Sequence, residues 1–113
     1  MDWTAFLDET NKELAELRSA MPETAKGFAA LAKAATTEGA LDPRTKELIA
    51  LAIGIDAHCD GCIGFHARAA RRNGATRAEV VETIAMTVYM GGGPSLMYGA
   101  KALAAFDASA PAD

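Results

Sequence analysis

Both cysteines of the chain lie in one short segment, Cys59-Asp60-Gly61-Cys62. Two side chains at positions i and i+3 of a helix share a face, so a helix that begins near Cys59 brings the two sulfurs within disulfide reach. In a chain without a visible secretory signal, this spacing favours redox or metal chemistry over a structural cross-link. The segment is therefore the first candidate for a reactive site.

His66 places a base beside the two thiols. It follows Cys62 by four residues and Cys59 by seven, so the three side chains fall on one stripe of the same helix. A single histidine on an apolar helix face is more often a core residue than a catalyst. Next to a CxxC segment on its own stripe, we favour the catalytic role.

Glu47 is the second ionisable residue on a face that should point inward, because it shares that face with Leu51 and Gly54. If the chain reverses at residues 56–58, Glu47 lies about three turns before the break and His66 about two turns after it. The two side chains are then expected to meet. Gly54 and Gly64 are expected to permit a close approach of the two helices.

The energetics of thiol ionisation constrain the roles of these residues. A thiol with a pKa near 8.5 is only ~3% thiolate at pH 7, so an effective nucleophile needs about 2.7 kcal/mol of stabilisation. A helix N-terminus supplies roughly 0.3–1 kcal/mol and at most ~2 kcal/mol. His66 can supply the remainder, whereas Glu47 placed against a sulfur would oppose ionisation. We therefore expect Glu47 to act through His66 or through a water molecule.

Hydrophobic periodicity and capping signals predict six helices that position these residues. Asp42-Pro43 is typical of a helix start, Asn73-Gly74 of a helix end, and Thr76 with Glu79 of a capping box. The triple glycine before Pro94 is interpreted as a helix break, since no strand precedes it. The expected helices cover about 3–17, 22–39, 43–55, 59–74, 77–91 and 96–106, and residues 108–113 are expected to form a frayed tail.

The composition supports an all-α fold. The chain of 113 residues contains 26 alanines but only eight valines and isoleucines, so it is poorly supplied with the branched side chains that sheets require. Its length predicts a single domain over residues 1–113. A core of small side chains also indicates burial against other copies of the chain, so we expect a homo-oligomer.

Charge and hydropathy disfavour two classes of partner. With 11 basic and 15 acidic residues, the chain has no basic surface for nucleic acid. The longest apolar run, residues 48–55, is far shorter than the ~20 residues that span a bilayer, so no membrane association is expected. No secretory signal is visible at the N-terminus, and a cytoplasmic location is expected.

The order of the site residues resembles a known family. Glu47 is followed after eleven residues by Cys59-x-x-Cys62, after three more by His66, and later by the glycine-rich Met90–Pro94 segment. This arrangement is similar to that of the AhpD-like branch of the carboxymuconolactone decarboxylase family. The resemblance runs from about Phe28 to Leu103.

The resemblance implies an AhpD-like bundle of about six helices, assembled as a homotrimer or homohexamer, that reduces hydroperoxides with electrons from a thiol or dithiol protein. By position, Cys62 would be oxidised to the sulfenic acid, Cys59 would donate a proton and close the disulfide, and Glu47 and His66 would form a proton relay. No cofactor or metal is implied. The best-known branch has a histidine immediately before the second cysteine, where this chain has Gly61, so slower proton delivery is expected.

Three alternatives remain at this point. The family's namesake activity, lactone decarboxylation, would not need a cysteine pair. A zinc site could be built from Cys59, Cys62, His66 and either His58 or Glu47, although three ligands on one helix stripe give poor tetrahedral geometry. The third alternative is a non-catalytic oligomeric module. The residues alone also favour Cys59 as the attacking thiol, because it is exposed at a helix start.

Overall fold

The structure, a computed structural model, describes residues 1–109, which form six α-helices and no strand. The predicted all-α fold is confirmed. None of the helices in this part of the chain is both long enough and apolar enough to cross a membrane. The helices are α1 (Trp3–Ala20), α2 (Pro22–Thr36), α3 (Pro43–Asp56), α4 (Asp60–Arg72), α5 (Arg77–Gly91) and α6 (Gly93–Ala108).

Local capping explains why several helices start where the sequence predicted. The Asp42 side chain accepts a hydrogen bond of 2.7 Å from the Thr45 N–H, and Pro43 occupies the first turn of α3. At the start of α5, Thr76 and Glu79 form the complete capping box, with each side chain bound to the other's backbone N–H. These starts depend on neighbouring residues, so they are visible in the sequence.

Helix α2 ends at Thr36, before the glycine at which the sequence placed its stop. A contact from α3 meets this end: the Lys46 ammonium donates hydrogen bonds to the backbone oxygens of Ala35 at 2.9 Å and Thr37 at 2.6 Å. A cation at these carbonyls satisfies acceptors that a helix C-terminus otherwise leaves free. Lys46 thus ties the end of α2 to the start of α3.

Helix α6 is longer than predicted at both ends. It starts at Gly93 instead of Leu96, because Gly92 makes the turn with a φ of 75° and Pro94 is tolerated in the first helical turn. At the other end, Ala108 is still helical, which corrects the expectation that the frayed tail begins there. Residues 110–113 of that predicted tail lie outside the described residues.

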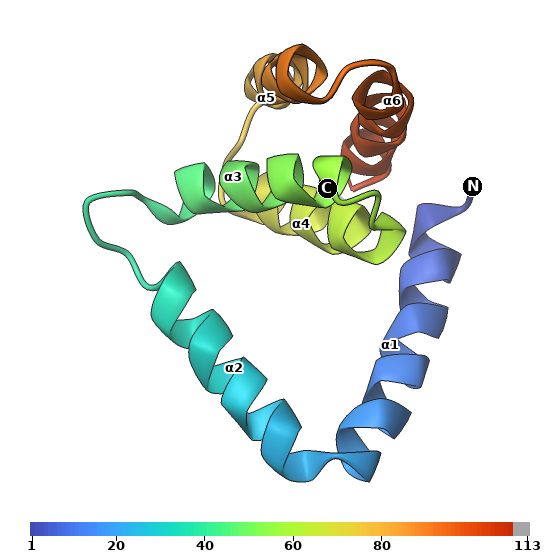
Figure 1. The fold of residues 1–113 in the computed structure, drawn as a ribbon, viewed down its shortest axis with the longest axis vertical. Coiled ribbons are helices and arrows are strands. Elements are labelled where there is room, and N and C mark those ends of the chain that lie inside the picture. The colour runs from blue at the N-terminus through green and yellow to red at the C-terminus, as the bar shows by residue number, and fades with distance from the viewer. Residues whose placement is uncertain (110–113) are drawn as a thin grey trace.

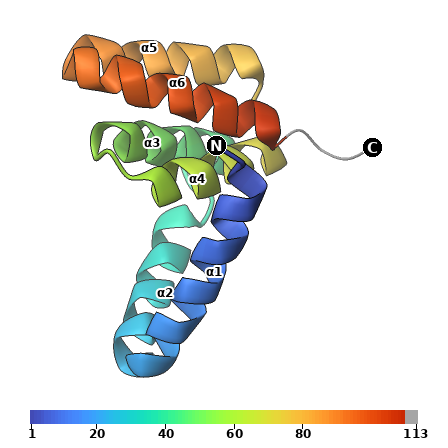
Figure 2. The same cartoon turned by 90° about the vertical axis from the view of Figure 1, so that its right-hand side faces the viewer.

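The helices are arranged in pairs that form layers (Figure 2). Helices α5 and α6 lie side by side on the layer made by α3 and α4, whereas α1 and α2 project from the opposite side. Figure 1 shows that α1 and α2 diverge from their junction like the two arms of a V. The core lies within and between the two upper layers, where the largest fully buried apolar side chains are Leu51, Ile55, Ile63, Val80 and Phe106.

Helix α1 is attached to this body through its first two turns. Trp3 and Leu7 are its buried residues, and both pack against Gly64 of α4. A Cβ atom at Gly64 would lie only 2.7 Å from Leu7 Cδ2 and 3.1 Å from Trp3 Cε3. Gly64 therefore makes room for α1, and the expectation that it brings α3 and α4 together is wrong.

Candidate active site

The candidate site lies where the chain reverses between α3 and α4. After Asp56, residues 57 and 58 make the turn, and His58 adopts the left-handed conformation with a φ of 55°. The Cys59 N–H then donates a hydrogen bond of 3.0 Å to the Gly54 oxygen. This turn places Cys59 in an extended conformation as the N-cap of α4.

Cys59 and Cys62 are joined by a disulfide across the first turn of α4, with their Cα atoms 5.2 Å apart. The predicted proximity of the two sulfurs is confirmed. The Cys62 N–H donates a hydrogen bond to the Cys59 sulfur at 3.1 Å. When the disulfide is reduced, a backbone N–H at a helix N-terminus is the kind of donor that stabilises a thiolate. The geometry therefore favours ionisation of Cys59.

Gly54 of α3 allows the first turn of α4 to approach closely. A Cβ atom built at this glycine would lie 3.1 Å from the Cys62 Cβ and 3.4 Å from the Ile63 backbone nitrogen. A larger residue would push the cysteine turn away from α3. The expectation that Gly54 permits close helix packing is correct.

Glu47 and His66 meet across the α3–α4 pair, as the hairpin geometry predicts. The Glu47 Oε2 and His66 Nδ1 atoms are 2.7 Å apart, and the two side chains are 13% and 38% exposed. An ionised carboxylate can only accept, so Nδ1 carries the hydrogen in this contact and donates it. The contact orients the ring and leaves Nε2 free to exchange a proton with another group.

Helix α6 also contacts the cysteine turn, through residues that the sequence did not single out. The Lys101 ammonium lies 3.2 and 3.3 Å from the two carboxylate oxygens of Asp60. The Tyr98 ring stacks on His58, with 4.5 Å between ring centroids and 8° between planes. Only the spacing of two polar side chains at i and i+3 on a mostly apolar helix could have indicated them.

A further contact from α6 holds the end of α3. The Ser95 hydroxyl, which is buried, donates a hydrogen bond of 2.5 Å to the Asp56 carboxylate. The residue just before the turn and the residues within it are therefore both held by α6. The cysteine turn is therefore supported both by α3 and by α6.

The side chains considered for zinc are arranged differently from a metal centre. Within residues 1–109, no group of three or more His, Cys, Asp or Glu side chains is arranged to hold a metal ion. His58 stacks on Tyr98, and Glu47 binds His66. Neither candidate fourth ligand is grouped with the cysteines, so the donor set does not fit a tetrahedral zinc site.

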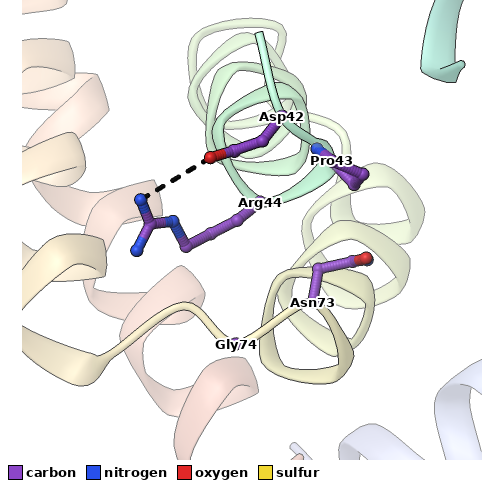
Figure 3. A pocket seen from close by; sticks show the side chains of 5 residues that line it. All are labelled: Asp42, Pro43, Arg44, Asn73 and Gly74. Atoms are coloured by element: carbon purple, nitrogen blue, oxygen red, sulfur yellow. Dashed lines mark ion pairs between the residues drawn. The ribbon is translucent and has the colours of Figure 1, made fainter. Parts of the chain in front are cut away.

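Two surface hollows lie beside α3, and neither includes a cysteine among its lining residues. The larger, about 420 Å³, lies between the start of α3 and the end of α4 (Figure 3). The second, about 340 Å³, lies between α3 and α5. The first is lined by Asp42, Pro43, Arg44, Asn73 and Gly74, and the second by Ala52, Ile53, Asp56, Ala57, Met86, Thr87 and Met90.

The larger hollow is explained by helix capping. The Asp42 carboxylate there accepts hydrogen bonds from the backbone and side chain of Thr45, which lower the pKa of Asp42 below its ordinary value of 3.8. Arg44 pairs with Asp42 at 3.8 Å, as drawn in Figure 3, and with Glu79 at 3.1 Å. These charges are already paired within the chain, so we assign no ligand to this hollow.

Solved structures share the fold. A carboxymuconolactone decarboxylase family protein of Legionella pneumophila is 50% identical, with a TM-score of 0.93 over 96% of this chain and 97% of its own. A protein of the same family from Thermotoga maritima, for which involvement in an antioxidative response has been suggested, is 29% identical. Its TM-score is 0.80 over 89% of this chain and 86% of its own.

Two sequence relatives cover more than nine-tenths of the chain. An uncharacterised protein of Cupriavidus necator is 44% identical over 107 residues, which are 95% of each chain. An uncharacterised protein of the cox locus of Paracoccus denitrificans is 38% identical over 104 residues, 92% of this chain and 87% of its own. The profile of the carboxymuconolactone decarboxylase family matches residues 22–105, a somewhat longer span than the 28–103 expected from the sequence. The chain therefore belongs to the carboxymuconolactone decarboxylase family.

Proposed function

We propose that the chain is a thiol-dependent peroxidase that reduces hydroperoxides through Cys59 and Cys62. One observation carries the proposal: a cysteine pair able to form a disulfide begins the same helix that holds an imidazole bound to a carboxylate. Glu47 and His66 then act as a proton relay. The suggested involvement of the Thermotoga maritima protein in an antioxidative response is consistent with this proposal.

The proposed catalytic cycle has three steps: attack on the peroxide, formation of the disulfide and reduction of the disulfide. A cysteine thiolate attacks the hydroperoxide ROOH, the O–O bond breaks, and the alkoxide leaves as ROH after it takes a proton, which His66 Nε2 can deliver. The attacking cysteine becomes a sulfenic acid. The second thiol attacks that sulfur, and water leaves as the disulfide forms. A thiol or dithiol protein then reduces the disulfide and is itself oxidised.

The order of attack distinguishes the two cysteines. Family resemblance assigns the sulfenic acid to Cys62 and the second attack to Cys59, and the proposal follows that order. The hydrogen bond from the Cys62 N–H to the Cys59 sulfur instead favours Cys59 as the more acidic thiol. A low pKa is not the only requirement for attack on a peroxide, since access and proton delivery to the leaving oxygen also matter.

The first experiment is a thiol titration of the reduced protein before and after brief treatment with cumene hydroperoxide. We expect both thiols of each chain to disappear, one molecule of cumyl alcohol to form per chain, and dithiothreitol to restore the thiols. An unchanged thiol count would reject the proposal.

Single serine variants identify the attacking sulfur. If Cys62 attacks, the Cys59→Ser variant forms a sulfenic acid that dimedone traps, while Cys62→Ser forms none. The reverse pattern would assign the attack to Cys59. Both variants should stop multiple turnovers, because neither can close the disulfide. Circular dichroism should show that both variants remain folded.

The relay is tested with Glu47→Gln and His66→Asn. General acid–base groups contribute typically about 10²- to 10⁴-fold to rate, so each variant should lose about 10²-fold or more in peroxide reduction. The pH dependence of the rate should flatten in His66→Asn. Unchanged rates and pH profiles in both variants would remove the relay from the mechanism.

The serine variants also distinguish the proposed function from the lactone decarboxylation after which the family is named. That reaction has no need of a redox cysteine pair, so Cys59→Ser and Cys62→Ser would leave it intact. The cysteine turn, the disulfide and the imidazole–carboxylate contact favour the redox function.

A further inference from the structure

Asp60 lies between the two cysteines and creates an electrostatic problem for the proposed thiol chemistry. It is the first residue of α4, directly after Cys59 and two residues before Cys62. A carboxylate is favourable at a helix N-terminus, but it opposes a second negative charge on a neighbouring sulfur. An unpaired Asp60 would therefore raise the pKa of both thiols.

Lys101 of α6 supplies the opposite charge at this position. Its ammonium lies 3.2 and 3.3 Å from the two Asp60 oxygens, so it contacts both oxygens of the carboxylate almost equally. The side chains are 43% and 33% exposed, which leaves the pair partly shielded from water. Such a pair interacts with nearby charges more strongly than a fully solvated one.

Two more contacts fix the position of Lys101 relative to the sulfurs. The ammonium lies 5.1 Å from the centroid of the Tyr98 ring, within the range of a cation–π interaction. The same ring stacks on His58, the residue immediately before Cys59. Helix α6 therefore holds the residue before the cysteine pair and the residue within it at the same time.

We propose that Lys101 is a positioning residue of the thiol site, whose ammonium offsets the Asp60 carboxylate so that a thiolate can form in the first turn of α4. This inference rests on the thiol chemistry proposed above and adds to it a charge pair that sets how readily the thiol ionises. Lys101 acts through the field at the sulfurs and not by contact with substrate.

The other ionisable groups around this turn have partners of their own. Asp56 at the end of α3 accepts a hydrogen bond from Ser95, and Glu47 farther along α3 binds His66 of α4. His58 in the turn is stacked against Tyr98. The Asp60–Lys101 pair is thus a charge pair of the cysteine turn distinct from the Glu47–His66 relay.

Removal of each charge should move the thiol pKa in opposite directions. Lys101→Met leaves the carboxylate uncompensated and raises the pKa of the more reactive cysteine, by about 0.5–1 pH unit. Asp60→Asn removes the like charge and lowers that pKa. In the double variant both charges are gone, so the pKa should return close to its original value. Lys101→Arg keeps the charge and should keep the pKa.

The experiment is the pH dependence of iodoacetamide alkylation of each cysteine in the reduced full-length protein, read by peptide mass spectrometry. We expect Lys101→Met to be alkylated about 3- to 10-fold more slowly at pH 7, with the opposite change in Asp60→Asn and recovery in the double variant. Shifts of the same sign in both single variants would indicate a packing role and overturn the inference. If Lys101→Met does not fold, an unchanged profile in Asp60→Asn overturns it as well.

This measurement separates the inference from the proposed function. Alkylation needs no peroxide, so a protein that fails to reduce cumene hydroperoxide but shows the opposed shifts would contradict the peroxidase proposal alone. A protein that reduces the peroxide but shows no opposed shifts would contradict only the role of Lys101.

Discussion

The α1–α2 arm and the α3–α6 body use the same kinds of side chain in opposite ways. In the body, Phe106 is fully buried among α-helical neighbours, whereas Phe28 on α2 is 70% exposed and α2 has no buried residue at all. Leu31 on the same helix is also exposed. Both regions are helical, but helices α3 to α6 share a buried core, whereas α2 adds no buried residue to it.

The exposed apolar face of α2 is the surface through which we expect the chain to self-associate. Isolated helices of this length are marginal in water, so an amphipathic helix normally depends on packing of its apolar face. Helix α2 is held at its C-terminal end by Lys46 and at its N-terminal end by the junction with α1. Its apolar side chains remain available for another copy of the chain, as the alanine-rich composition led us to expect.

The largest expected effect is on stability, and it appears when a phenylalanine is replaced by alanine in each of the two regions. Phe106→Ala removes a fully buried ring and should lower the free energy of unfolding by about 3–5 kcal/mol. Phe28→Ala removes an exposed ring and should change it by no more than about 0.5 kcal/mol in dilute protein. Urea denaturation at several protein concentrations measures both.

The concentration series sharpens the comparison. A cost of Phe28→Ala that grows with protein concentration would report lost contacts between copies, because association stabilises the folded chain by mass action. Equal costs for the two variants at the lowest concentration would show that the arm packs within its own chain. That result would contradict the division into arm and body.

The sequence predicted helix starts and a contact between two adjacent helices better than contacts between distant residues. The starts of α3 and α5 were predictable because Asp42-Pro43 and Thr76 with Glu79 act on their own helix ends. The Glu47–His66 contact was predictable too, since a short reversal fixes how two adjacent helices face each other.

Contacts made by distant residues were not predictable. Lys101 is 41 residues from Asp60, and nothing in its own neighbourhood distinguishes it from any exposed lysine. Gly64 was expected to face α3, but the first turns of α1 occupy that space. Which helix covers a given face depends on the packing of the whole chain, and local periodicity does not contain that information.

The second prediction concerns self-association through the arm. Leu31→Asp places a charge on the exposed apolar face of α2 and should weaken association about 10- to 100-fold, because burial of a leucine contributes about 1.5–3 kcal/mol. Sedimentation velocity over a range of concentrations measures the change. Glu23→Gln, on the same helix but on an exposed polar position, is the matched control.

A protein that stays monomeric at micromolar concentration would contradict the role given to the arm. An oligomer unaffected by Leu31→Asp would place the interface elsewhere, for instance on the exposed Met86 and Tyr89 of α5. Either outcome would leave the disulfide and the Glu47–His66 and Asp60–Lys101 contacts in place, since these are made within one chain.

The smallest expected effect is a pH-dependent change in thermal stability from the ion pair between Arg77 and Asp107. Arg77 at the start of α5 donates hydrogen bonds of 3.0 and 3.2 Å to Asp107 near the end of α6. These bonds, together with the positive charge of Arg77, lower the pKa of Asp107 below its ordinary value of 3.8, and Asp107 in turn raises the pKa of Arg77. The pair closes the α5–α6 hairpin opposite its glycine turn.

The direction of the pH effect follows from that shift. A carboxyl group whose pKa is lower in the folded chain contributes stability above its unfolded pKa and loses it as the pH falls through the folded value. Asp107→Asn should therefore lower the midpoint of thermal unfolding slightly at pH 7. It should leave the midpoint nearly unchanged at a pH below the lowered folded pKa of Asp107, where the native carboxyl is already protonated. The charge-matched control on the arm is Asp8→Asn, which should change the midpoint less than Asp107→Asn at pH 7. If Asp107→Asn still lowers the unfolding midpoint at low pH, the side chain acts by its shape and not by its charge. An ionised carboxylate accepts both hydrogen bonds from Arg77, whereas a protonated carboxyl has lost the charge that strengthens them.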